Sequence, residues 1–140
     1  MKKYFIVFAI LIFSSAFSLA DDEAFYSALQ NCKAYSNQGQ TKTDGNNIAF
    51  KSQILGWENN KCTYKESVSF AGMDSCTICK FSKDQINELV TVMRAYSTVQ
   101  KYSGETVDTS SLSAAQNNPV VRVWNKYLSD PAVCNIEFSK

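Results

Sequence analysis

The sequence predicts a single α+β domain in which helices cover one face of an antiparallel sheet. Three segments of alternating apolar and polar residues, the pattern of half-buried strands, follow one another within residues 47–81. One segment with helical spacing of apolar residues precedes them, and two more follow. We therefore predict an N-terminal helix, a three-stranded antiparallel meander, two C-terminal helices packed on one sheet face, and a candidate short terminal strand.

The first 20 residues have the pattern of a signal peptide. Lys2 and Lys3 precede a continuous apolar run over residues 4–13, and small residues occupy positions 18 and 20, where signal peptidase reads the chain. The run is shorter than the about 20 residues that a membrane-spanning helix needs. We expect cleavage after Ala20 and export to the periplasm or the medium. Residues 21–140 then form one disulfide-stabilised domain without a membrane attachment.

The composition narrows the classes of partner and of chemistry. The 14 basic residues, less the two leader lysines, stand against 13 acidic ones, which gives no electrostatic basis for binding nucleic acid. The chain has no histidine, which excludes Ser-His-Asp and Cys-His catalysis. It also has no glycine-rich phosphate loop and no N-x-S/T sequon. We therefore expect no metal and no cofactor, and favour a non-enzymatic bacterial protein.

The N-terminal helix is predicted over residues 21–36. Its apolar stripe recurs at i, i+3, i+4 and i+7, and consists of Phe25, Ala28, Leu29 and Cys32. Cys32 therefore belongs to the buried side of the helix. We expect residues 37–39 to end the helix, and residues 40–47 to form a polar loop with a turn at Asp44-Gly45.

The first strand is predicted over residues 47–57, and a turn over residues 58–61. One face of this strand is apolar and contains Ile48, Phe50 and Ile54. A strict two-residue loop would set this face against the wrong face of the next strand. We therefore expect one extra residue, in a three-residue loop or in a bulge at Gly56. Leu55 and Trp57 are then expected on the far face of the sheet.

The central stretch, residues 61–81, is predicted to form the other two strands. One parity of its first strand faces the core and contains Cys62, Tyr64, Glu66, Val68 and Phe70. A turn centred near Gly72 and Met73 would pair Glu66 with Cys79, and Tyr64 with Phe81.

This register predicts a candidate binding patch on the far face of the sheet. Ile78 would lie there with Leu55 and Trp57, and Cys76 would point the same way. Aromatic and aliphatic side chains on a face without helices are suited to bind a partner, here an unknown protein or small molecule. The alternative is that the last helix or the tail covers this face.

Two helices are predicted after the sheet, over residues 82–102 and 118–128. Ser82 and Gln85 have the capping-box spacing at the start of the first. The intervening residues 105–117 are expected to be a loop. Residues 132–138 are the candidate terminal strand.

Export predicts that cysteines pair, because the compartment is oxidising. The pattern turns Cys32, Cys62 and Cys79 toward the core, and Cys134 follows a helix that must dock there. These four are the disulfide candidates, in any of three pairings, and Cys76 is left unpaired. The register disfavours Cys62–Cys79 by distance, and we favour Cys32–Cys62 with Cys79–Cys134. The protein would then be a monomer or a Cys76-linked dimer.

Two further hypotheses concern chemistry. Cys76 and Cys79 form a C-x-x-C motif, which predicts a thiol–disulfide redox protein as the alternative function. The following helix begins too late in the chain to lower the pKa of the Cys76 thiol strongly. Glu66, on the buried parity, is expected to be a sheet-edge residue or a partner of Lys51 or Lys65, and otherwise a general acid with a raised pKa.

Overall fold

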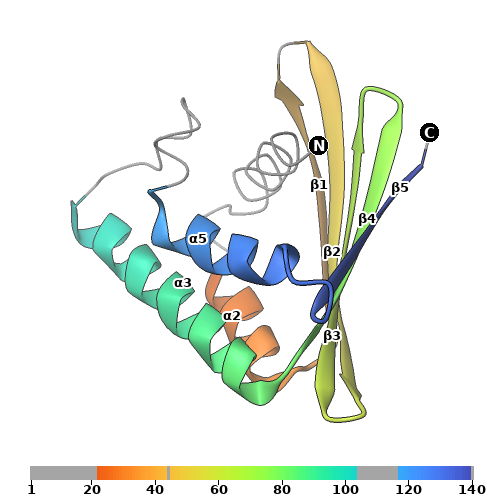
Figure 1. Cartoon of the computed structure of the whole chain (residues 1–140). Helices are drawn as coiled ribbons and strands as arrows, with labels where there is room; N and C mark the ends of the chain where they lie inside the picture. The colour runs from red at the N-terminus through yellow and green to blue at the C-terminus, as the bar shows by residue number, and fades with distance from the viewer. Residues whose placement is uncertain (1–21, 44, 104–116, 140) are drawn as a thin grey trace.

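Figure 1 shows a computed structural model of the chain, which describes residues 22–43, 45–103 and 117–139. The predictions for the signal peptide and for the loop over residues 105–117 fall largely or wholly outside this part. The described chain is α+β, with one five-stranded antiparallel sheet and three helices. The predicted class is therefore confirmed, but the sheet has five strands rather than three and a short one.

The strands follow one another across the sheet in chain order, each antiparallel to the next. They are β1 Tyr35–Thr43, β2 Asn46–Glu58, β3 Lys61–Phe70, β4 Met73–Phe81 and β5 Cys134–Ser139. The predicted terminal strand is β5. It comes back after two helices to pair with β4 and forms one edge of the sheet, while β1 forms the other.

Strand β1 replaces what the sequence predicted as the end of a helix and a polar loop. The helix α2, Asp22–Asn31, stops earlier than predicted because Cys32 adopts a left-handed conformation, with φ 47°. The strand that follows has only one apolar residue, Tyr35, because an edge strand buries little. At its centre, Gly39 lies against the ring of Phe50, where an added Cβ would come within 2.7 Å of a ring carbon.

The predicted extra residue between β2 and β3 is confirmed. The hairpin has a two-residue turn, Asn59-Asn60, in which both residues have positive φ. The register shifts between Ile54, which is opposite Tyr64, and Gly56, which is opposite Thr63. The extra residue is therefore Leu55, and the bulge keeps the apolar faces of both strands on one side.

The predicted pairing between β3 and β4 is wrong by two residues. Tyr64 is opposite Cys79, and Glu66 is opposite Thr77. The turn consists of Ala71-Gly72 alone, both with positive φ, so β4 begins at Met73. Since side chains alternate with a period of two, this shift leaves every residue on its predicted face.

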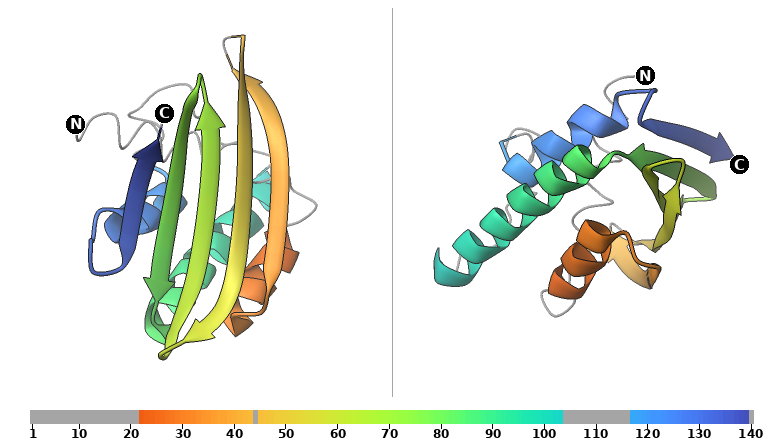
Figure 2. Two further views of the ribbon diagram at one scale, coloured as in Figure 1. Left: turned by 90° about the vertical axis from the view of Figure 1, so that its right-hand side faces the viewer. Right: turned by 90° about the horizontal axis from the view of Figure 1, so that it is seen from below.

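The three helices lie on one side of the sheet, as Figure 1 and the right-hand view of Figure 2 show. Besides α2 they are α3, Lys83–Ser103, and α5, Pro119–Leu128. The capping box at α3 is confirmed: the Gln85 backbone N–H donates to Ser82 Oγ, and the Ser82 N–H donates to Gln85 Oε1 at 2.8 Å. Asn118 caps α5 by accepting a hydrogen bond from the Val120 N–H.

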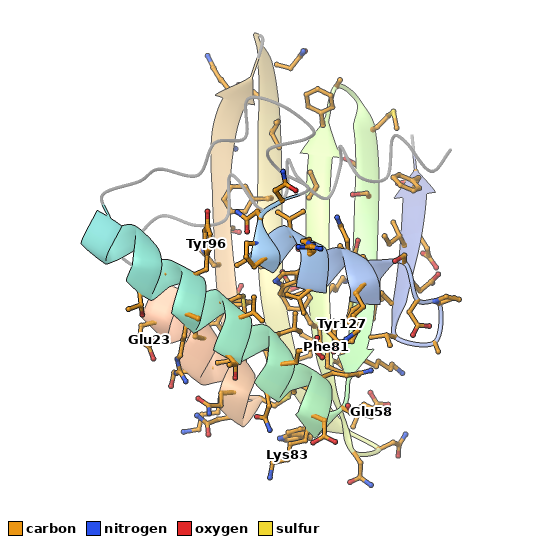
Figure 3. The ribbon with its side chains drawn as sticks, turned by 60° about the vertical axis from the view of Figure 1, so that its left-hand side comes forward. Glu23, Glu58, Phe81, Lys83, Tyr96 and Tyr127 are labelled. Atoms are coloured by element: carbon orange, nitrogen blue, oxygen red, sulfur yellow. A yellow bond between two sulfur atoms is a disulfide. The ribbon has the colours of Figure 1, made fainter. Side chains whose placement is uncertain are left out.

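The main core lies between these helices and the lower part of the sheet. Phe81 and Tyr127 meet there, with ring centroids 5.7 Å apart (Figure 3). Trp124 packs between the strands and α5, 5.4 Å from the ring of Tyr64. The largest fully buried side chains are Trp124, Phe81, Leu29, Ile54, Ile86, Leu89, Met93, Cys62 and Cys79.

Polar side chains tie the helices to one another at the surface. Arg94 of α3 contacts Glu23 of α2 at 2.7 Å. Glu88 of α3 accepts hydrogen bonds from Lys126 at 2.8 Å and from the Tyr127 hydroxyl at 2.5 Å. These hydrogen bonds lower the pKa of Glu88, and the bond from Lys126 has the larger effect.

Candidate functional site

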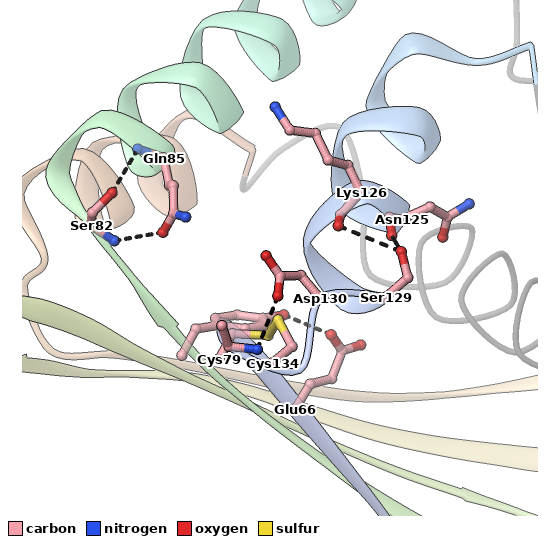
Figure 4. Close-up of a disulfide and its surroundings, with 11 residues drawn as sticks. Glu66, Cys79, Ser82, Gln85, Asn125, Lys126, Ser129, Asp130 and Cys134 are labelled. Atoms are coloured by element: carbon pink, nitrogen blue, oxygen red, sulfur yellow. Dashed lines mark hydrogen bonds between the residues drawn. A yellow bond between two sulfur atoms is a disulfide. The ribbon is translucent and has the colours of Figure 1, made fainter.

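The four core cysteines form two disulfides in the favoured pairing. Cys32–Cys62 joins the end of α2 to β3, with Cα atoms 5.9 Å apart. Cys79–Cys134 joins residues directly opposite each other on β4 and β5, close to the start of α3 (Figure 4). The bridges thus fasten the N-terminal helix and the C-terminal strand to the centre of the sheet. Cys76 is the free cysteine and is half-buried.

The redox hypothesis is not supported by this arrangement. Cys79 is bonded to Cys134, so it does not pair with Cys76. The two residues of the motif are three apart on β4, and their side chains therefore point to opposite faces. Helix α3 begins only at Lys83, so its dipole acts on neither sulfur as it would in a motif at a helix N-terminus.

The outer face of the sheet, defined as the face away from α2, α3 and α5, contains two exposed aliphatic residues. Leu55 is 56% exposed and Ile78 is 37% exposed. The left-hand view of Figure 2 looks onto this face, and no described helix crosses it. The alternative that the last helix or the terminal strand covers this face is wrong, because α5 lies on the other side and β5 extends the edge.

Trp57 does not lie with these two residues. It is opposite Cys62, whose side chain faces the helices, and directly opposed residues of antiparallel strands share a face. The cause is the bulge at Leu55, which gives the next outer position to Gly56. Trp57 is half exposed at the end of β2. The predicted patch is therefore divided, with Leu55 and Ile78 on one face and Trp57 on the other.

Three lysines lie near the two aliphatic residues on the outer face, which by register also holds Glu58, Asp74 and Glu137. Lys65 is directly opposite Ile78, and Lys80 is the next outer residue on β4. Lys51 lies on the same face of β2, opposite Ser67. None of these three lysines forms an ion pair within the described ranges. The centre of the outer face therefore combines exposed apolar surface with unpaired positive charge.

The helix-side face contains a buried polar row that the sequence did not predict. Ser52, Glu66 and Thr77 are directly opposite one another on β2, β3 and β4, and all three are buried. The row separates the main core from a second apolar cluster further along the strands, formed by Ile48 and Val68 with half-buried Phe50 and Phe70. Register alone brings these polar residues together, since each comes from a different strand.

Glu66 is the charged residue of this row and is 5% exposed. The Tyr64 hydroxyl donates a hydrogen bond to its Oε2 at 2.7 Å, whereas Oε1 has no hydrogen-bond partner within the described residues. Burial raises the pKa of Glu66 to about 7, and the bond from Tyr64 offsets part of that rise. Burial and the nearby Glu66 charge raise the pKa of Tyr64 well above its usual value.

The expected surroundings of Glu66 were wrong in two respects. β3 is the central strand of the sheet, so Glu66 is not an edge residue. Lys51 and Lys65 lie on the outer face, so neither can pair with it. The raised pKa agrees with the third alternative, but no second carboxylate lies in this row to serve as its catalytic partner.

Comparisons with protein-family models, with curated proteins and with solved structures find no match to this chain. Within the described residues, no group of three or more side chains has the arrangement of a metal site. None of the three described helices is both long enough and apolar enough to cross a membrane.

Proposed function

We propose that this chain is an exported, disulfide-stabilised interaction protein that binds a partner protein through the outer face of its sheet. The observation that carries the proposal is an outer face that no described helix covers and that exposes Leu55 on β2 and Ile78 on β4. Large apolar side chains exposed on a sheet face without helices are suited to contact a partner. The two disulfides agree with an oxidising compartment, and therefore with the proposed export.

The charge of this face indicates the chemistry of the partner. Lys51, Lys65 and Lys80 flank the aliphatic pair and have no ion-pair partner in the described chain. An acidic surface with an apolar centre would complement both features, since opposite charges steer association and apolar contact supplies affinity. We propose a partner protein with such a surface.

Site-specific photocrosslinking in the cell that makes the protein tests this proposal. We would replace Ile78 with p-benzoylphenylalanine, and Thr91, an exposed residue of α3, with the same group as the matched control. We expect one defined adduct from position 78 and none from position 91. Adding Lys65→Glu and Lys80→Glu should abolish the adduct, because it reverses the charge beside the apolar pair. Equal adducts from both positions, or an adduct that survives charge reversal, would contradict the proposal.

A further inference from the structure

We propose that Glu66 and the second apolar cluster form a binding site for a cationic amphiphile, namely a primary amine with an apolar body. The site lies on the helix-side face of the sheet, beyond the main core, and is independent of the outer face. The amine would donate to Glu66 Oε1, and the apolar body would lie along β3 over Val68 and Phe70.

The first observation is a buried carboxyl oxygen without a partner. Glu66 Oε1 is inaccessible, and no donor reaches it from the described residues. Burying such a group without a hydrogen bond is unfavourable. A ligand that donates a hydrogen bond at this position would recover that cost, and a cationic donor would recover more.

The second observation is the absence of positive charge around this carboxyl in the described chain. The described residues that face Glu66 are Ser52 from β2, Thr77 from β4 and Tyr64 from its own strand. Trp124 of α5 and Phe25 of α2 pack against Tyr64, 5.4 and 6.2 Å from its ring, and carry no charge. Tyr64 is the only titratable group among them. A cation from outside the protein would therefore meet an uncompensated acid.

The third observation is that apolar residues follow the acid along β3 toward an exposed end of the sheet. Along β3, Glu66 is followed on the same face by Val68 and Phe70. From Glu66 to Phe70 the strand spans about 13 Å, close to the length of extended n-decylamine. Met73, opposite Phe70, is 44% exposed. Phe138, in the row of Val68, is 53% exposed. The apolar body would begin at this exposed rim.

We expect the ligand to reach the acid past the side chain of Phe70, which is the last residue of this face on β3. Its ring is half-buried at the end of β3, directly before the Ala71-Gly72 turn. The Phe50 ring of the same cluster lies against Gly39. Rotation of the Phe70 ring would open the way from the rim to Glu66.

Isothermal titration calorimetry on the protein purified as the cell exports it tests the proposal. We would compare n-decylamine with n-decanol, which has the same apolar body and a neutral head. At about pH 8, where Glu66 is mostly ionised, we expect decylamine to bind at least about tenfold more tightly than decanol. Glu66→Gln should remove that tenfold preference and leave decanol unchanged.

A matched pair of surface variants places the ligand on the correct face. Met73→Ser removes rim surface on the helix side, and Leu55→Ser removes comparable exposed surface on the outer face. Both residues are exposed, so both variants should fold. We expect Met73→Ser to weaken decylamine binding about threefold and Leu55→Ser to leave it unchanged. Three results would overturn the proposal: a loss of binding in Leu55→Ser but not in Met73→Ser, decylamine binding to Glu66→Gln as tightly as to the wild type, or no decylamine binding at all. The last result would mean that water satisfies Oε1.

Discussion

The two faces of the sheet differ in how many charged residues they hold: among the described strands, every charged residue except Glu66 projects from the outer face. Within the described strands, every lysine projects by register from the outer face; these are Lys42, Lys51, Lys61, Lys65 and Lys80. The helix-side face of the same strands has one charged residue, Glu66. Alternate positions along one strand are therefore buried against the helices or exposed to solvent. Glu66 is the exception, and the fold alone does not explain it.

The largest expected difference between the faces is in the free energy of unfolding lost when cysteines are replaced. Replacing Cys79 and Cys134 together by serine should lower the free energy of unfolding by about 4 kcal/mol, because that bridge closes a loop with a sequence separation of 55. Removing Cys32–Cys62, with a separation of 30, should cost slightly less. Guanidinium unfolding followed by circular dichroism measures both.

Cys76→Ser on the outer face is the control, and should change the free energy of unfolding by less than about 0.5 kcal/mol. A cost comparable with that of a bridge variant would show that Cys76 has a structural role that its half-buried position does not indicate.

Two neighbouring aliphatic residues of β2 allow the same kind of substitution to be compared on the two faces. Ile54 is 1% exposed and Leu55 is 56% exposed. Ile54→Ala should cost about 3–4 kcal/mol of unfolding free energy, since it leaves a cavity in the main core. Leu55→Ala should cost less than about 0.5 kcal/mol. Similar costs in urea unfolding would mean that the bulge does not turn Leu55 away from the core.

The sequence predicted which face of the sheet a side chain lies on more reliably than which residues pair across strands. The register between β3 and β4 was wrong by two residues, yet Cys79 and Cys76 were placed on the correct sides because the error was even. Trp57 was placed on the wrong face because the extra residue was expected in the loop or at Gly56, whereas it is Leu55. An error of one residue reverses a face, whereas an error of two does not.

Two features depend on contacts that no local pattern records. β1 has almost no apolar residues, and its sequence signal was the Asp44-Gly45 dipeptide directly before β2, which is typical of a two-residue hairpin. The polar row around Glu66 consists of residues from three strands, so it becomes visible only when the register is known. By contrast, the capping box at Ser82 is local, and it was predicted correctly.

Glu66 makes stability depend on pH, with a sign opposite to that of an ordinary carboxylate. Its pKa is about 7 in the folded protein and has an ordinary value of 4.5, so between these values the folded state holds more protons than the unfolded state. The free energy of unfolding should therefore fall by about 3 kcal/mol as the pH rises through this window. Urea unfolding across the window measures the slope.

Two variants separate this effect from other titrations. Glu66→Gln should abolish the slope and leave the variant more stable than the wild type at the upper end of the window. Tyr64→Phe should extend the slope to higher pH, because the hydrogen bond from Tyr64 lowers the pKa of Glu66. An unchanged slope in Glu66→Gln would assign the pH dependence to another group.

The smallest expected difference between the faces lies in β1, at two adjacent positions. Gly39 faces the helix side under the Phe50 ring, and an added Cβ would come within 2.7 Å of a ring carbon. Gly39→Ala should therefore displace the ring and cost about 1 kcal/mol of unfolding free energy. Gln38→Ala, on the outer face, should change it by less than about 0.5 kcal/mol. If Gly39→Ala were instead neutral or stabilising, the gain from a stiffer strand would exceed the cost of moving Phe50, and the second apolar cluster would have room to adjust to a ligand.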